Sequence, residues 1–176
     1  MKPWGFLGPF AVALVLTCVL LLPAGEALAA QANAFVYHRF GDDRYPSTNV
    51  SVAVFRRQLE LLRQNDYQVL ALGQVVERLE KGQALPERCA VLTIDDGYES
   101  FASGGLPLLK EFGYPATLFV STDSVGRPGY LGWEALRRIA EAGIEIGNHS
   151  AAHEHMAAPR AGEDAAAWRE RMRNDL

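Results

Sequence analysis

The feature that most constrains the fold of this chain is an alternation of short apolar segments with longer stretches of helical pattern. The short segments are rich in β-branched residues and lie at residues 34–38, 68–70, 90–94, 116–120 and 144–146. Strands that alternate with helices form parallel sheets whose faces the helices cover. The sequence therefore predicts an α/β fold with a parallel sheet.

Amphipathic helices are expected between these strands and after the last one. Apolar residues recur at spacings of three or four around residues 55–62, 75–79, 106–112 and 136–140. Glycine and proline residues lie at the positions where the predicted helices are expected to end. A further helical pattern covers residues 165–176, and the polar stretch 157–164 before it is expected to be a loop.

Residues 1–30 have the features of a secretory signal peptide. Lys2 gives a positive start, residues 11–22 form an apolar run, and Ala27-Leu28-Ala29 is a small-x-small cleavage pattern. A retained membrane anchor is the alternative, but the run falls short of the ~20 apolar residues that a spanning helix needs. We therefore expect a mature domain of residues 31–176 that is exported to the periplasm, cell envelope or exterior, without stable membrane insertion.

Composition limits what such a mature domain can be. Hydrophobic residues make up 49% and charged residues 22% of the chain, which is ordinary for one globular domain. Cys89 would be the only thiol left, so stability must come from an apolar core and not from an internal disulfide. The net charge of −4 and the lack of a Lys or Arg run argue against nucleic acid as a partner.

Two adjacent carboxylates, Asp95 and Asp96, directly follow the apolar segment 90–94. This is the carboxyl end of a predicted parallel strand, where such sheets present ligand sites. Neighbouring carboxylates repel, and a bound cation relieves that repulsion, while Gly97 gives the backbone freedom to turn both side chains to one point. The alternative is a solvated turn, since Asp-Gly is a common turn dipeptide.

Three of the four histidines lie close together just after the last predicted strand. His149 and His153 are four residues apart, so their imidazoles can converge on one ion. The alternative is a pair of surface histidines, but their coincidence with Asp95 and Asp96 favours a zinc-like site with coordination positions left open for water. His155 is expected to point elsewhere, and Asn148 to orient the loop.

The two motifs resemble those of polysaccharide deacetylases of the NodB-homology group, carbohydrate esterase family 4. Thr93-Ile94-Asp95-Asp96-Gly97 is similar to the family motif Thr-Phe-Asp-Asp-Gly, with Ile94 as a conservative departure, and His149 to His153 match His-Ser/Thr-x-x-His. Residues 37–40 and 118–120 also resemble strands that flank the site in bacterial members acting on poly-N-acetylglucosamine. The resemblance runs from about Ala34 to the end.

The resemblance implies a distorted (β/α) barrel and a metal-dependent hydrolase that removes N-acetyl groups from a polysaccharide. It implies that Asp96, His149 and His153 bind a divalent metal, usually zinc, and that Asp95 is the general base. A backbone N–H near Gly97 or Tyr98 would then help to hold the oxyanion.

Further candidates for substrate contact are His38 and Trp133. His38 ends the first predicted strand and could contact substrate or support Asp95, the alternative being a structural histidine. Trp133 and Tyr130 could form a wall for stacking a sugar ring. However, Gly132-Trp133-Glu134 also suits a helix start, which favours a packing role for the tryptophan.

The sequence also departs from the family pattern. No Arg-x-Pro-Tyr, Asp-Trp or Leu-x-His segment follows the second motif, and the family's general-acid histidine belongs to the last of these. We therefore expect a partial barrel that lacks its last strands, in a truncated and weakly active or inactive chain. The alternative function is a secreted metal- and glycan-binding module without turnover, although an intact Asp95 favours the enzyme.

Overall fold

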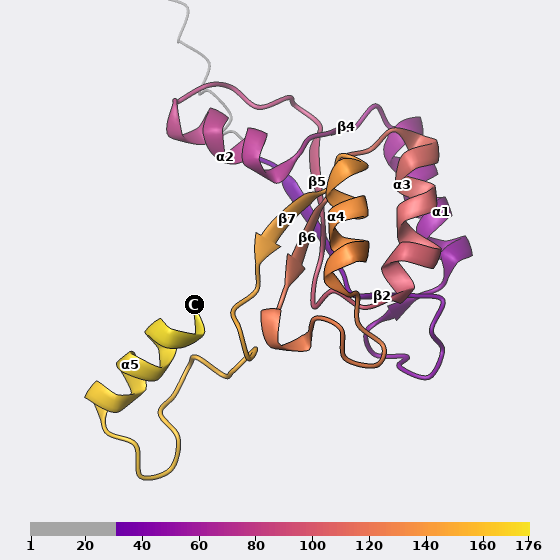
Figure 1. Ribbon diagram of the computed structural model, residues 1–176. Coiled ribbons are helices and arrows are strands. Elements are labelled where there is room, and N and C mark those ends of the chain that lie inside the picture. Colours follow the sequence, from indigo (N-terminus) through magenta and orange to yellow (C-terminus); the bar gives the residue numbers. More distant parts are fainter. Residues whose placement is uncertain (1–30) are drawn as a thin grey trace, which may run out of the picture.

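The computed structural model describes residues 31–176, which form a parallel sheet flanked by helices (Figure 1). The sheet has five strands: β1 (Asn33–Tyr37), β4 (Gln68–Val69), β5 (Cys89–Ile94), β6 (Thr117–Val120) and β7 (Glu145–Asn148). β1 pairs along its whole length with β5, which also pairs with β4 at its start and with β6 at its end, and β6 pairs with β7. All pairings are parallel, and all five predicted strands are confirmed.

Five α-helices lie where the apolar periodicity predicted them. They are α1 (Val52–Gln64), α2 (Leu72–Glu80), α3 (Leu106–Phe112), α4 (Trp133–Glu141) and α5 (Ala165–Asp175). Ser51 caps the start of α1: its Oγ accepts a hydrogen bond from the N–H of Val54 at 3.2 Å and so satisfies one of the free donors of the first turn. Helices α1, α3 and α4 lie together on one side of the sheet, whereas α5 projects away from it (Figure 1).

The core is built around β5, which is buried along its whole length. Its Leu92 and Ile94 pack in one cluster with Phe55 and Leu59 of α1 and with Phe101. Continuous burial is expected of a central strand in a parallel sheet, because both of its faces are covered. The residues that follow Ile94 therefore start from a rigid position.

Several short elements were not predicted from the sequence. A two-stranded parallel ribbon pairs β2 (Arg39–Phe40) with β3 (Asn49–Val50), and a π-helix, η1 (Phe101–Gly105), precedes α3. Two-residue strands carry no readable periodicity. The π-helix packs closely on β2, and a Cβ on Gly104 would lie 2.7 Å from Cβ of Phe40.

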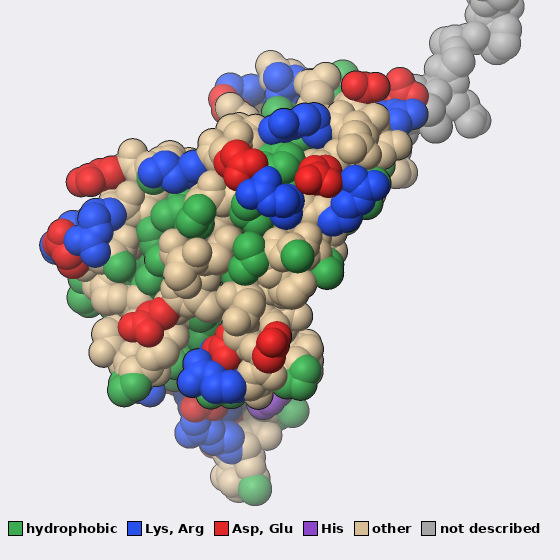
Figure 2. Space-filling model, turned by 90° about the vertical axis from the view of Figure 1, so that its right-hand side faces the viewer, with side chains coloured by type: hydrophobic (Ala, Val, Ile, Leu, Met, Phe, Trp, Pro, Cys, Tyr) green, Lys and Arg blue, Asp and Glu red, His purple; other side chains and the backbone are tan. Residues whose placement is uncertain are grey.

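Charged side chains of both signs are interspersed over the face shown in Figure 2. Within residues 31–176, none of the helices has the length and apolarity needed to cross a bilayer. The predicted signal peptide lies outside the described residues.

Candidate metal centre

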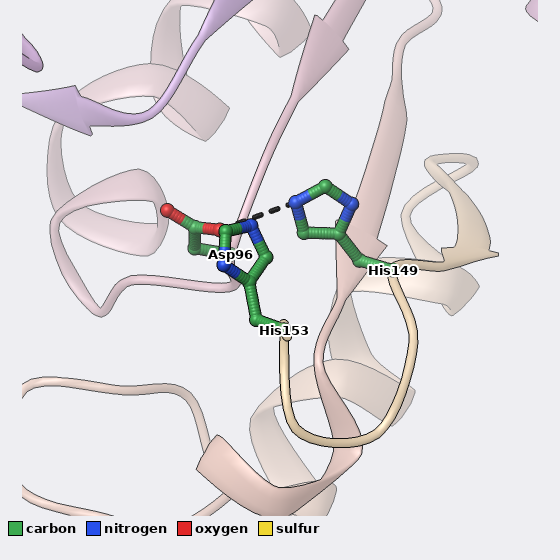
Figure 3. A group of neighbouring side chains, drawn as sticks. All are labelled: Asp96, His149 and His153. Atoms are coloured by element: carbon green, nitrogen blue, oxygen red, sulfur yellow. Dashed lines mark ion pairs between the residues drawn. The ribbon is translucent and has the colours of Figure 1, made fainter. Parts of the chain in front are cut away.

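The side chains of Asp96, His149 and His153 converge at the carboxyl end of the sheet (Figure 3). Asp96 follows β5, and the two histidines follow β7, the strand beyond β6. Oδ1 of Asp96 lies 3.3 Å from Nε2 of His149 and 3.5 Å from Nε2 of His153. One possible ligand atom from each residue lies within 4.8 Å of the others, so residues about fifty positions apart form one cluster.

The spacing of these atoms suits a small divalent cation. Two ligands that are each ~2.0–2.1 Å from a tetrahedrally coordinated zinc ion lie about 3.4 Å apart. The two separations between Asp96 and the imidazoles, 3.3 and 3.5 Å, agree with this value. Two imidazole nitrogens and one carboxylate oxygen are also a usual set of protein ligands in catalytic zinc sites, where a fourth position stays open. The residues present therefore fit a metal site.

Three residues in the two loops that form the cluster have a left-handed backbone conformation. Asp96 has φ 73°, Ser150 has φ 63° and His153 has φ 56°. Only one other non-glycine residue among residues 31–176 has a positive φ, so this conformation is concentrated at the site. Non-glycine residues in this region cost on the order of 1–3 kcal/mol each and persist where the surroundings determine the backbone.

Hydrogen bonds within the loop hold the histidines in place. Oδ1 of Asn148 accepts from the N–H of Ser150 at 2.7 Å, and Oγ of Ser150 accepts from the N–H of His153 at 3.0 Å. From the end of β6, Oγ of Ser121 donates to the carbonyl of His149 at 2.9 Å. Asn148 orients the loop, as predicted.

The carboxyl end of α5 supports the same loop from the other side. The N–H of Ala151 donates to the backbone oxygen of Asp175 at 2.6 Å, and Nδ2 of Asn148 donates to that of Leu176 at 2.6 Å. The buried side chain of Asp175 accepts from the N–H of Ala152. Backbone N–H donors, with Ala152 first, hold the pKa of Asp175 below its ordinary value. The histidine loop is therefore fixed by a helix far along the chain.

Asp95 lies beside the cluster on the same turn. Its backbone N–H donates to the carbonyl of Tyr37 in β1 at 2.8 Å, which continues the sheet pairing by one residue. Burial raises the pKa of its carboxyl group above the ordinary value. The half-buried carboxyl group is thus partly shielded from water.

The aromatic candidates differ in their surroundings. The ring of Tyr98 packs against that of Tyr130, with centroids 4.9 Å apart. Trp133 is the first residue of α4, and 58% of it is exposed, so the favoured packing role was wrong. Its side chain instead lines a shallow pocket with Ile146 of β7.

His155 is exposed and is not among the three clustered residues, in line with the prediction that it points away from the metal site.

Sequence reasoning missed the supporting residues Ser150, Ser121 and Asp175. Asp175 acts through a contact with Ala152, 23 positions away, and no local pattern points to it. Ser150 stands inside the second motif, so its side-chain bond to His153 could have been anticipated from the ability of serine to cap nearby N–H groups.

Comparison with known proteins gives the family. The sequence profile described as polysaccharide deacetylase matches residues 82–176, which is more than half of the chain. The chain belongs to the polysaccharide deacetylase family.

Curated relatives match this chain over only part of their own length. The poly-beta-1,6-N-acetyl-D-glucosamine N-deacetylase of Escherichia coli K12 is 32% identical over 125 residues, covering 62% of this chain and 18% of the relative. The Bacillus subtilis protein YxkH is 29% identical over 124 residues, covering 70% of this chain and 44% of the relative. The chain thus spans less than half of either relative.

Solved structures support the fold. A de-N-acetylase from Aggregatibacter actinomycetemcomitans has a TM-score of 0.74 at 20% identity, covering 82% of this chain and 70% of that chain. IcaB from Ammonifex degensii has a TM-score of 0.68 at 24% identity, covering 81% and 63%. The predicted α/β fold of the deacetylase type is confirmed, and the described chain covers part of it.

Proposed function

We propose that this protein is a metal-dependent hydrolase that removes N-acetyl groups from a polysaccharide of N-acetylated amino sugars, with zinc as the expected ion. The observation that carries the proposal is the convergence of Asp96, His149 and His153 at zinc-like spacing beside Asp95. Membership in the polysaccharide deacetylase family supports it, as does the name of the E. coli relative.

In this proposal Asp96, His149 and His153 hold the ion. A divalent cation there supplies Lewis acidity toward the acetyl carbonyl and brings the pKa of a bound water toward ~7. The imidazoles bind in their neutral form, and Asp96 contributes one negative charge. Three protein ligands leave room on the open side of the site for water and for the substrate oxygen.

Asp95 accepts the proton of the attacking water. General bases of this kind contribute ~10²–10⁴-fold to the rate. Its position suits the role, because its backbone is tied to Tyr37 and its side chain is directed by the same turn that presents Asp96. The partial burial that raises its pKa also makes it a better proton acceptor.

The turn after Asp96 offers donors for the developing oxyanion. Within the described chain, neither the N–H of Gly97 nor that of Tyr98 donates a hydrogen bond, although the carbonyl of Gly97 accepts from Leu131 at 2.9 Å. Backbone N–H groups that are fixed and free suit an oxyanion hole. We assign this role to one or both of them.

The proposal assigns no residue of this chain to protonation of the departing amine. In the family, the histidine that protonates the amine lies in a Leu-x-His segment, and residues 1–176 contain no such segment. Loss of a general acid costs ~10²–10⁴-fold, so we expect slow turnover from residues 1–176 alone. His38 and Trp133 are kept as proposed substrate contacts.

The proposal also includes export. Residues 1–30 are proposed to be a secretory signal and residues 31–176 the N-terminal part of the deacetylase domain, on the sequence features given above. The enzyme would then meet its polysaccharide in the periplasm, in the cell envelope or outside the cell.

Acetate release tests the proposal directly. The chain is incubated with N-acetylglucosamine oligomers after treatment with chelator, with and without added Zn²⁺, beside a longer form that continues past Leu176. We expect acetate only with metal. Acetate at equal rates in chelator would contradict the mechanism, and oligomer binding without acetate from either form would favour the binding module.

A further inference from the structure

We propose that Arg39 is a positioning residue for the turn of residues 95–98. Through its contact with the ring of Tyr98, it fixes the backbone N–H groups of Gly97 and Tyr98 that we assign to the oxyanion. Arg39 lies in β2, outside the turn, and so it acts through Tyr98. The inference rests on the proposed function and names one further residue for it.

The turn that follows β5 departs from regular structure. Asp96 and Gly97 are both left-handed, with φ of 73° and 76°. Two successive residues of this kind belong to neither a strand nor an ordinary helix. The direction of the N–H groups of Gly97 and Tyr98 therefore depends on what the turn packs against.

Backbone hydrogen bonds attach one side of the turn to a neighbouring loop. The N–H of Glu99 donates to the carbonyl of Gly129 at 3.0 Å. The N–H of Leu131 donates to the carbonyl of Gly97 at 2.9 Å. Tyr98 stands between the two bonded residues of the turn, so both of its neighbours in the chain are held.

Arg39 and the residue after it attach the turn to the ribbon of β2 and β3. Cζ of Arg39 lies 3.4 Å from the ring centre of Tyr98. Next to it, the N–H of Phe40 donates to Oγ of Ser100 at 3.2 Å. Both contacts join β2 to the segment directly after Gly97, so the turn is held by two separate parts of the chain.

Arg39 is itself held in place. Its backbone N–H donates to the carbonyl of Thr48 at 3.0 Å, within the ribbon. Its guanidinium also lies 3.8 Å from the ring centre of Tyr45, and its side chain is only 12% exposed. The attraction between a cation and an aromatic face is stronger when the cation is withdrawn from water in this way.

The charge of Arg39 distinguishes it from a residue that only fills space. Its Nε is buried and has no hydrogen-bond partner within residues 31–176, and its Nη1 is 3.7 Å from Oδ2 of Asp42, too far for a hydrogen bond. Burying a charged group is costly unless the group is paired. An apolar side chain would fill the same space at lower cost, so the contact with the aromatic rings is the interaction that uses the charge.

Amide hydrogen exchange on the full chain tests the positioning of the turn. The amides of Glu99 and Leu131 report on the turn, and that of Leu70, which donates to Ala90 at 2.9 Å, is the reference. Arg39→Met, which keeps the length of the side chain and removes its charge, should speed exchange at Glu99 and Leu131 about tenfold and leave Leu70 unchanged. Arg39→Lys, which keeps a cation near the ring, should have a smaller effect.

Acetate release from N-acetylglucosamine oligomers with Zn²⁺ tests the consequence for the reaction. Oxyanion donors act in the transition state, so Arg39→Met should lower kcat about tenfold with KM and zinc affinity unchanged, and Arg39→Lys should recover part of kcat. Arg63→Met is the matched control, because Arg63 also stacks on an aromatic ring, 4.2 Å from the ring centre of Phe112. That contact joins α1 to α3, and its loss should change neither exchange at the turn nor kcat.

A second variant guards against a failure of Arg39→Met to fold. Tyr45→Ala removes the other ring in contact with the guanidinium, at a residue that is 45% exposed, and it should also speed exchange at Glu99. Wild-type exchange at Glu99 and Leu131 in both variants, or a higher KM with unchanged kcat, would overturn the inference and leave the deacetylase proposal intact. Faster exchange without metal-dependent acetate release from any form would sustain the positioning of the turn while the proposed function fails.

Discussion

Oδ1 of Asp175, in the last turn of α5, accepts a hydrogen bond from the backbone N–H of Ala152 at 2.5 Å. Ala152 immediately precedes His153, so a helix outside the sheet determines the path of the loop that carries two of the three clustered residues.

Loss of the Asp175 carboxylate should weaken the histidine loop. Asp175→Ala removes the acceptor of the Ala152 N–H, and a hydrogen bond contributes ~0.5–1.5 kcal/mol to stability. We expect a lower free energy of unfolding in urea and weaker zinc binding by competition with a chromophoric chelator. Glu170→Ala, at an exposed position on the same helix, should change neither quantity. Unchanged zinc affinity in Asp175→Ala would contradict the supporting role.

The same carboxylate predicts how the loop responds to acid. The pKa of Asp175 is lower in the folded chain than its ordinary value of 3.8, so its contribution is fully present above that value and is lost as pH falls through the folded pKa. Amide hydrogen exchange at Ala151 and Ala152 should speed up below about pH 4 beyond the intrinsic effect of pH. Asp175→Asn, which keeps an acceptor oxygen and does not titrate, should remove the extra acceleration.

Substitution should distinguish the proposed roles of the neighbouring residues Asp95 and Asp96. Asp95→Asn keeps the shape of the turn and all three proposed ligands, so we expect bound zinc and a ~10²–10⁴-fold loss of acetate release. Asp96→Asn should instead lose the metal, because a neutral amide replaces the charged ligand. Zinc content and acetate are measured on the same samples. Loss of zinc from Asp95→Asn would mean that the two roles are exchanged.

Among the histidines, His153 and His155 form a matched pair. Both are exposed, but only His153 lies near Oδ1 of Asp96, at 3.5 Å. His153→Ala should lower zinc affinity at least tenfold, whereas His155→Ala should leave it unchanged. Isothermal titration with Zn²⁺ distinguishes the two, and equal losses would argue for a third imidazole at the site.

The close packing of the π-helix predicts that a larger side chain at Gly104 destabilises the fold. Gly104→Ala would place a Cβ 2.7 Å from Cβ of Phe40 and 3.1 Å from its backbone oxygen, and overpacking of this kind costs ~1–3 kcal/mol. Gly132→Ala is the control, because it has an ordinary φ of −87° and nothing within 4 Å of the added Cβ. Thermal unfolding of both variants measures the difference.

The periodicity of the sequence predicted the sheet and the helices because each is a local property of burial. β5 is apolar at almost every position and is buried at every one, and the ends of the strands placed Asp96 and the two histidines at one edge. These positions follow from parallel pairing alone.

The support of the site could not be predicted in the same way. Asp175 reaches Ala152 only because α5 packs back on the loop, and Arg39 lies between Tyr45 and Tyr98 because two separate turns meet. Trp133 was assigned to packing from its place at a helix start, but the first residue of α4 faces outward. Such contacts depend on tertiary geometry that no short pattern encodes.

The strands that carry the candidate ligand residues are not neighbours in the sheet, because β6 runs between β5 and β7. Adjacent strands are ~4.8 Å apart, so the ends of these two strands are separated by about 10 Å, which the aspartate and imidazole side chains must span. β6 carries none of the three clustered residues, yet its width sets that span. In a metal site of the proposed kind, substitutions in the mostly buried β6 that shift β5 relative to β7 would therefore change which ion radius fits.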